Sequence, residues 1–123
     1  MQALTLTLIL ATVTASAVAQ LALKMGMKTP AVAAALPEGG KALILAAAAS
    51  PLVWTGLIIY GLSVVVWLWI LAKVDLSLAY PFVGVSFIAV MLFGIFLLGE
   101  SVTPLRIAGT FLIAVGCILV ARS

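Results

Sequence analysis

Five polar residues recur at intervals of four in the first apolar stretch of the sequence: Thr12, Ser16, Gln20, Lys24 and Lys28. Side chains four residues apart lie on one face of a helix, so this spacing predicts a polar stripe. Inside a membrane such a stripe faces a partner helix or a wet cavity, where it bonds to other helices or contacts a substrate. We take Ser16, Gln20 and Lys24 as candidate substrate-binding residues.

Aromatic residues add to this set from two later stretches. Tyr60, Ser63 and Trp67 follow one another at spacings of three and four, which again places them on one helical face. Trp67 suits a cavity wall as well as a packed aromatic position. Tyr80 precedes Pro81, which removes a backbone donor and bends a helix, and bent helices are where transporters build binding sites near the midplane. Tyr60, Trp67 and Tyr80 complete the candidate substrate-binding residues.

Small residues mark the places where helix backbones can approach one another. Three alanines beside the polar stripe, a glycine after Pro81 and two glycines in the last apolar stretch have this role: Ala11, Ala15, Ala19, Gly84, Gly109 and Gly116. The last pair indicates a packing or dimer surface rather than a binding site.

The elements that carry these residues are apolar enough to require a membrane. Hydrophobic residues make up 67% of the 123 residues and charged residues 7%, with a mean hydropathy of +1.45. Soluble domains carry about 25% charged residues, and about 20 apolar residues in a helix cross the bilayer core. The sequence predicts an all-α membrane protein, one domain over 1–123 with four transmembrane helices at about 3–23, 51–72, 76–98 and 104–121, and an interfacial segment at about 41–49.

Helix-capping residues, prolines and short turns between the apolar stretches predict where each helix begins and ends. Ser50-Pro51 and Thr103-Pro104 combine a favoured N-cap with a proline in the first helical turn. The short turn Lys73–Asp75 forces the second and third spans to be antiparallel neighbours. The first stretch also resembles a signal peptide with a small-residue cleavage site, but no basic residue precedes Lys24, so we expect a retained span.

Basic residues are divided unequally between the two ends of such a bundle. The end away from the termini holds four, Lys24, Lys28, Lys41 and Arg106, whereas the other end holds Lys73 and Arg122. The positive-inside rule then favours termini outside the cytoplasm, and so small a difference is also compatible with insertion in both orientations.

Several function classes are excluded by composition. The chain has no histidine and one cysteine, Cys117, and no cluster of acidic residues or thiols at ligand spacing, so we expect no metal site and no cofactor. No basic run with interleaved aromatic residues indicates nucleic-acid binding. No acid, base, nucleophile and orienting group can be assembled within the spans, so we expect no enzyme.

Three runs resemble a known superfamily: ASAVAQLALK (15–24), LSLAYP (76–81) and LGESVTPLRIAG (98–109). Together they resemble the drug/metabolite transporter superfamily, and more closely its four-span, EamA-like and small multidrug resistance-like members. Within these, glutamine followed four residues later by lysine is most similar to the small subunits that flip aminoarabinose-phosphoundecaprenol. The resemblance covers nearly the whole chain apart from residues 29–50.

One departure from the resemblance bears on mechanism. The small multidrug exporters depend on a membrane-embedded glutamate in the first span, and Ser16 stands at that position here. Serine does not exchange protons at physiological pH and does not neutralise a bound cation. The resemblance therefore implies a transporter of the bacterial inner membrane that flips a polyprenyl-phosphate-linked sugar, with Lys24 attracting the phosphate or simply ending its helix.

Two alternatives stay open: a small exporter of metabolites or drugs, and a non-transporting scaffold subunit. Four short helices leave little internal volume, so a path for a head group requires a dimer, either of two copies or with a paralogue. The expected partners are that second subunit and membrane lipids, including the polyprenyl-phosphate substrate.

Overall fold

The computed structural model describes residues 3–123, and every regular element in that range is a helix. Four helical segments are long and apolar enough to cross a membrane, which confirms the all-α, four-span fold. Three of them are single helices: α1 (Ala3–Met27), α4 (Pro51–Leu71) and α7 (Pro104–Ala121). The third segment along the chain, Leu76–Phe96, consists of three consecutive helices: α5 (Leu76–Ala79), η2 (Tyr80–Phe82) and α6 (Val83–Phe96). Between α1 and α4 lie the short helices α2 (Pro30–Ala35), η1 (Leu36–Glu38) and α3 (Gly40–Ala48).

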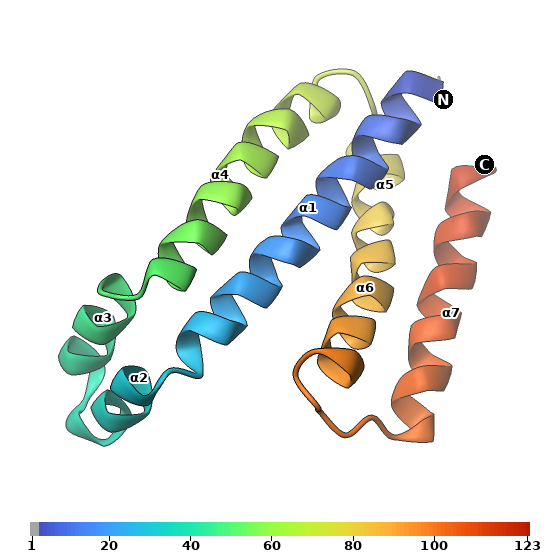
Figure 1. Ribbon diagram of the computed structural model, residues 1–123. Helices are drawn as coiled ribbons and strands as arrows, with labels where there is room; N and C mark the ends of the chain where they lie inside the picture. Colours follow the sequence, from blue (N-terminus) through green and yellow to red (C-terminus); the bar gives the residue numbers. More distant parts are fainter. Residues whose placement is uncertain (1–2) are drawn as a thin grey trace.

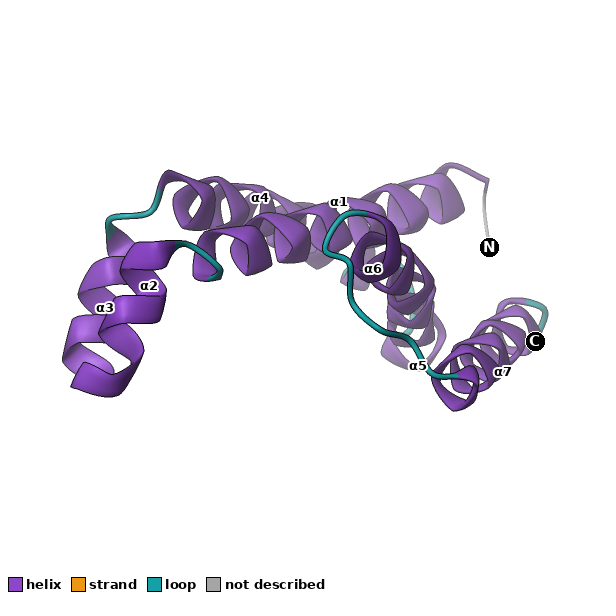
Figure 2. Ribbon diagram, turned by 60° about the horizontal axis from the view of Figure 1, so that its bottom comes forward, coloured by secondary structure: helices purple, strands orange, loops and turns teal. Residues whose placement is uncertain are grey.

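The four long segments form an open row in the order α4, α1, α6 and α7 (Figures 1 and 2). Helix α1 packs along α4 and against α6, whereas α7 packs against α6 and η2. The segments alternate in direction, so α1 begins and α7 ends at the same end of the molecule (Figure 1). Only 11% of α7 is buried. Much of α7, at one edge of the row, is therefore left for lipid or a partner.

Proline positions explain where the long helices begin. Pro51 and Pro104 each occupy the first helical turn, where a missing backbone N–H costs nothing. The hydroxyl of Thr103 accepts a hydrogen bond from the Arg106 backbone N–H over 3.2 Å, which caps α7. Helix α1 continues to Met27, past the expected end near residue 23, because lysine is a good helix former and Lys24 does not interrupt it.

The helical segment that begins at Leu76 is broken where the sequence predicts a bend. A short 3-10 turn, Tyr80–Phe82, separates α5 from α6, and Pro81 lies within it. Phe82 and Ala79 are buried there against Ile9 and Val13 of α1 and Ile70 of α4, and these five residues form the hydrophobic core. The break in the third segment is thus anchored on the first two helices.

Small residues bring the helices together at two crossings. A Cβ atom on Gly56 of α4 would lie 2.9 Å from the carbonyl oxygen of Ala19, which is fully buried in α1. A Cβ atom on Gly84 of α6 would lie 2.6 Å from Ile113 of α7. The close approach expected at Gly84 is therefore made by α7. Gly109 and Gly116 have no such neighbours within the described chain and leave that part of α7 open.

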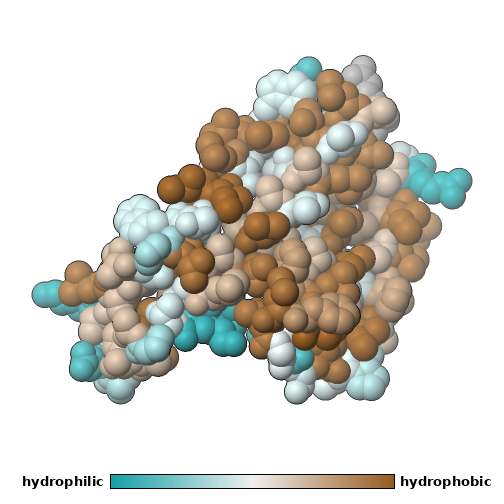
Figure 3. Space-filling model, viewed as in Figure 1, coloured by the Kyte–Doolittle hydropathy of each residue, from teal (hydrophilic) through white to brown (hydrophobic). Residues whose placement is uncertain are grey.

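Polar side chains gather toward the two ends of the molecule, and apolar side chains cover the long helices (Figure 3). The short helices α2 and α3 lie beside each other at the end opposite the termini (Figure 1). Trp54 near the start of α4 donates a hydrogen bond from its indole to the Ala48 carbonyl, which ties α3 to α4. Helix α3 coincides with the segment expected at the membrane interface.

Candidate functional site

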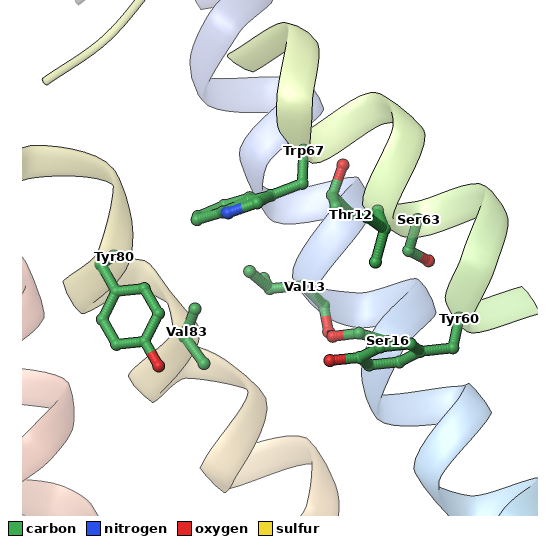
Figure 4. Close-up of a pocket in the computed structure, with 9 residues that line it drawn as sticks. Thr12, Val13, Ser16, Tyr60, Ser63, Trp67, Tyr80 and Val83 are labelled. Atoms are coloured by element: carbon green, nitrogen blue, oxygen red, sulfur yellow. The ribbon is translucent and has the colours of Figure 1, made fainter. Parts of the chain in front are cut away.

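A cavity of about 160 Å³ lies where α1, α4 and η2 meet, and we call it the hydroxyl groove. Its lining is mostly polar or aromatic and includes four of the six candidate residues: Thr12, Val13, Ser16, Tyr60, Ser63, Val64, Trp67, Tyr80 and Val83. In Figure 4 the rings of Tyr60 and Trp67 extend from α4 across α1 toward Tyr80. The groove thus joins residues separated by up to 71 positions.

Hydrogen bonding within the groove fixes what it can offer a ligand. The hydroxyls of Thr12, Ser16 and Ser63 donate to backbone carbonyls of their own helices over 2.7, 2.9 and 2.9 Å. Their oxygens keep lone pairs that accept from a ligand. The Tyr60 and Tyr80 hydroxyls have no hydrogen-bond partner within residues 3–123 and can donate or accept. The lining carries no charge, so the groove suits a neutral, hydroxyl-rich group.

Gln20 and Lys24 lie elsewhere, in a cavity of about 220 Å³ between α1 and α6 that we call the charged vestibule. It is lined by Gln20, Leu21, Lys24, Val90, Phe93, Leu98 and Glu100. The polar stripe of α1 is therefore divided between two cavities. The reason is helical geometry: at 3.6 residues per turn, each step of four turns the side chain by about 40°, so the stripe winds from α4 toward α6.

Glu100 is the site residue that sequence reasoning missed. Although Glu100 and Arg106 are close in the sequence, no salt bridge joins them in the part of the chain that the structure describes. Arg106 instead donates to the Ser101 carbonyl over 3.4 Å. The Glu100 carboxylate folds back over α6, where a Cβ atom on Gly94 would lie 2.5 Å from its Oε1. The run Leu98-Gly99-Glu100 was a signal for this turn.

A third cavity, the apolar groove, has a volume of about 400 Å³ and lies between α6 and α7. Its lining residues are Tyr80, Pro81, Val83, Gly84, Phe87, Ile113, Gly116, Cys117 and Val120. Tyr80 and Val83 line both this groove and the hydroxyl groove. A polar and an apolar compartment therefore meet at the helix break.

Among residues 3–123, no three His, Cys, Asp or Glu side chains come together as possible ligands of a metal ion. The lone Cys117 is buried and donates to the Pro81 carbonyl. The chain thus has two cavities with several polar side chains in their lining and one whose lining is mainly apolar.

Comparison with known proteins gives this arrangement a context. The chain is similar to the probable 4-amino-4-deoxy-L-arabinose-phosphoundecaprenol flippase subunit ArnE of Pseudomonas savastanoi pv. phaseolicola. The two sequences are 35% identical over 79 aligned residues, and the aligned region covers 64% of this chain and 69% of that protein. The chain belongs to the family of these flippase subunits. The ArnE protein of Pseudomonas aeruginosa strain UCBPP-PA14 is 36% identical over 74 residues, 60% of this chain and 64% of its own length.

The chain is also similar to a flippase subunit of another name, ArnF. ArnF of Shewanella sediminis is 37% identical over 70 residues, which cover 55% of this chain and 48% of that protein. No family model and no solved structure matches. Membership of the flippase-subunit family agrees with the resemblance that the sequence motifs carry, and it makes this chain part of a group of transporter subunits.

Proposed function

We propose that this chain is one subunit of a carrier that flips a polyprenyl-phosphate-linked sugar across the bacterial inner membrane. The observation that carries the proposal is the uncharged hydroxyl groove within a chain whose relatives are named as flippase subunits. Flipping requires the polar head group to cross about 30 Å of hydrocarbon. The carrier must therefore offer polar side chains that replace the hydrogen bonds between the head group and water.

The hydroxyl groove supplies that replacement. A sugar offers hydroxyl donors to the oxygens of Ser16, Thr12 and Ser63, which have already used their own hydrogens. Tyr60 and Tyr80 supply the complementary donors. No carboxylate is present to bind a cation, so a cationic drug gains no counter-charge there. The groove therefore favours a sugar over the substrates of a cation exporter.

The apolar groove supplies a place for the lipid part of the substrate. It shares Tyr80 and Val83 with the hydroxyl groove, so one molecule can place its head group on one side of η2 and its chain on the other. Burial of apolar area gains roughly 25 cal/mol per Å², and an isoprenoid chain also finds equivalent contacts in lipid. The apolar groove can therefore orient the isoprenoid chain of the substrate without binding it tightly.

A complete path requires a second subunit. The row of helices is open, and α7 is largely exposed at its edge. We assign the partner as a paralogous four-span subunit, because relatives of two names, ArnE and ArnF, are both similar to this chain. Two such rows facing one another would enclose the hydroxyl grooves of both subunits.

The test is to extract the chain in native-lipid particles and identify retained lipids by mass spectrometry. We expect enrichment of a polyprenyl-phosphate glycoside over bulk phospholipid, and its loss in Gln20→Leu. A non-transporting scaffold would tolerate Gln20→Leu and Tyr80→Phe with unchanged activity of its complex. Absence of any polyprenyl phosphate, with binding of soluble metabolites or cations instead, would contradict the proposal and favour the exporter.

A further inference from the structure

The connection between α1 and α4 is long and helical, unlike the other connections between the long segments of residues 3–123. Helix α1 ends at Met27 and α4 begins at Pro51, whereas residues 72–75 alone separate α4 from α5. We call residues 30–48, which form α2, η1 and α3, the α2–α3 hairpin. We propose that this hairpin is a binding surface for anionic phospholipid, with one face of α3 inserted in the leaflet. The surface lies outside the three cavities described above, so the proposal does not depend on the substrate.

The hairpin packs against itself and against the start of α4. Helix α3 contacts α2, η1 and α4. Val32 of α2 is 1% exposed and Ala35 is also buried, although neither belongs to the hydrophobic core of the long segments. Leu43, Ala46 and Ala47 of α3 are half-buried, and their spacing of three and four places them on one side of that helix. This side of α3 is its inner face, which the rest of the protein covers.

The opposite side of α3, its outer face, is exposed and mainly apolar. It consists of Lys41, Ile44, Leu45 and Ala48, again at spacings of three and four. Ile44 is 69% exposed and Leu45 is 62% exposed. Two of the three large apolar side chains of α3 thus point away from the rest of the protein. Because apolar side chains are unfavourable in water, this face indicates an apolar partner.

The position of the hairpin makes the bilayer surface that partner. Helices α1 and α4 are both long and apolar enough to cross a membrane, so the hairpin between them lies at the level where the membrane ends. In Figure 2 the hairpin turns away from the line of α4 and α1 and projects to one side of the row. Trp54 near the start of α4 donates to the Ala48 carbonyl, and its ring is 53% exposed. Tryptophan is typical of membrane interfaces, so the outer face continues into the lipid-facing surface of α4.

Lys41 gives the outer face a preference for anionic lipid. Its side chain lies three residues before Ile44 and four before Leu45, so its ammonium can reach a phosphate while its apolar stem follows the leaflet. Helix α3 contains no acidic residue. Apolar residues and lysine on one helix are typical of helices that lie in the membrane interface and bind anionic lipid. A protein partner would have to neutralise Lys41 as well as bury its apolar neighbours, whereas a leaflet offers phosphates beside its apolar core.

The net charge at this end of the molecule agrees with that preference. Four basic and two acidic residues lie there: Lys24, Lys28, Lys41, Arg106, Glu38 and Glu100. Helices α1 and α4, which the hairpin joins, supply most of the lining of the hydroxyl groove. Binding of the hairpin to the leaflet would therefore fix the depth at which that groove lies in the membrane.

The first experiment measures which solvent the outer face contacts. The full chain carries Cys117→Ser, which removes its single thiol, and a bimane fluorophore on Ile44→Cys. The protein is placed in vesicles of phosphatidylcholine and phosphatidylglycerol, and quenching by brominated phospholipid is compared with quenching by aqueous iodide. Ile58→Cys, at a 60% exposed position within α4, is the reference for lipid, and Glu38→Cys is the reference for water. We expect the label at residue 44 to be quenched by brominated lipid and protected from iodide.

The second measurement tests the preference for anionic lipid at the same label. In vesicles with equal amounts of the two phospholipids, either one or the other is brominated. We expect phosphatidylglycerol to be enriched beside residue 44 by roughly two- to fivefold, the value of one lysine near an anionic surface. Lys41→Gln should remove the enrichment, and Lys41→Arg should keep it. Lys73→Gln removes the same charge at the other end of the molecule, beyond the Debye length of about 10 Å, and should leave the enrichment unchanged.

Three outcomes would overturn the proposal. Quenching at residue 44 that matches the Glu38→Cys reference would place the outer face in water. Protection from both quenchers would mean that another protein or a second copy of this chain covers the face. Equal quenching by the two brominated phospholipids, or equal effects of Lys41→Gln and Lys73→Gln, would show that the hairpin does not recognise anionic lipid.

Discussion

The thiol of Cys117 in α7 donates a hydrogen bond to the carbonyl of Pro81 in η2 over 2.7 Å. The same sulfur would lie 2.9 Å from a Cβ atom on Gly84, so α7 also packs tightly against the start of α6, just after the break in the third segment. The α7 helix is only 11% buried, and this bond is the one side-chain hydrogen bond recorded between long segments of residues 3–123. The attachment of α7 depends on few contacts.

Cys117→Ala should therefore destabilise the protein. The change removes the bond to Pro81 and leaves space beside Gly84, with a combined cost of about 1–2 kcal/mol. Cys117→Ser keeps a donor of similar size and should lose less. Thermal unfolding in detergent, followed by loss of the monodisperse species, ranks the three proteins. An alanine variant as stable as wild type would show that α7 is held by other contacts.

The crossing of α1 and α4 gives a second prediction with its control in the same helix. Gly56→Ala places a methyl group 2.9 Å from the Ala19 carbonyl oxygen and 2.8 Å from Leu23 Cγ, so the helices must separate at a cost of about 1–3 kcal/mol. Gly61→Ala meets no atom within 4 Å and should be neutral or stabilising by up to about 1 kcal/mol. Melting temperatures that change equally would contradict the assigned crossing.

The fold was predictable because its signals are local and strong. Uncharged stretches of membrane length predict the four helices, and Ser50-Pro51, Pro81 and Thr103-Pro104 predict the starts and the bend that the structure contains. These features depend on the cost of charges in lipid and on the missing N–H of proline, both of which act within a few residues.

The composition of the site was less predictable because it depends on which helices meet. Four candidates, Ser16, Tyr60, Trp67 and Tyr80, share the hydroxyl groove, but Gln20 and Lys24 do not. Residues at intervals of four are not exactly aligned, because each step rotates the side chain by about 40° around the helix axis. Over the length of α1 this rotation divides the polar stripe between the two cavities. Glu100 was missed because its place depends on the turn at Gly99 and on the space above Gly94, which are tertiary features.

Removing the tyrosine hydroxyls of the hydroxyl groove should weaken substrate binding and leave the stability of the protein unchanged. Tyr60 and Tyr80 hydroxyls bond to no partner within the described residues, so Tyr→Phe at either position should not alter the melting temperature. Each change should weaken retention of a polyprenyl-phosphate sugar by roughly two- to tenfold, the value of one hydrogen bond. Lipid mass spectrometry of the purified variants measures this. Unchanged retention in the double variant would exclude the groove as the head-group site.

A carboxylate at Ser16 tests why the groove is uncharged. Wild type should not bind a soluble organic cation such as tetraphenylphosphonium, because no acid lies in the groove. Ser16→Glu places an acid among Tyr60, Trp67 and Tyr80, and it should bind the cation more tightly as pH rises, since only the ionised carboxylate neutralises it.

The matched variant Thr14→Glu adds the same acid to an exposed position of α1 outside the groove and should not bind the cation. Equilibrium dialysis with the radiolabelled cation between pH 5 and pH 9 distinguishes the three proteins. Tight binding by wild type would favour the small exporter over the flippase subunit, because it would require a counter-charge that the hydroxyl groove does not contain.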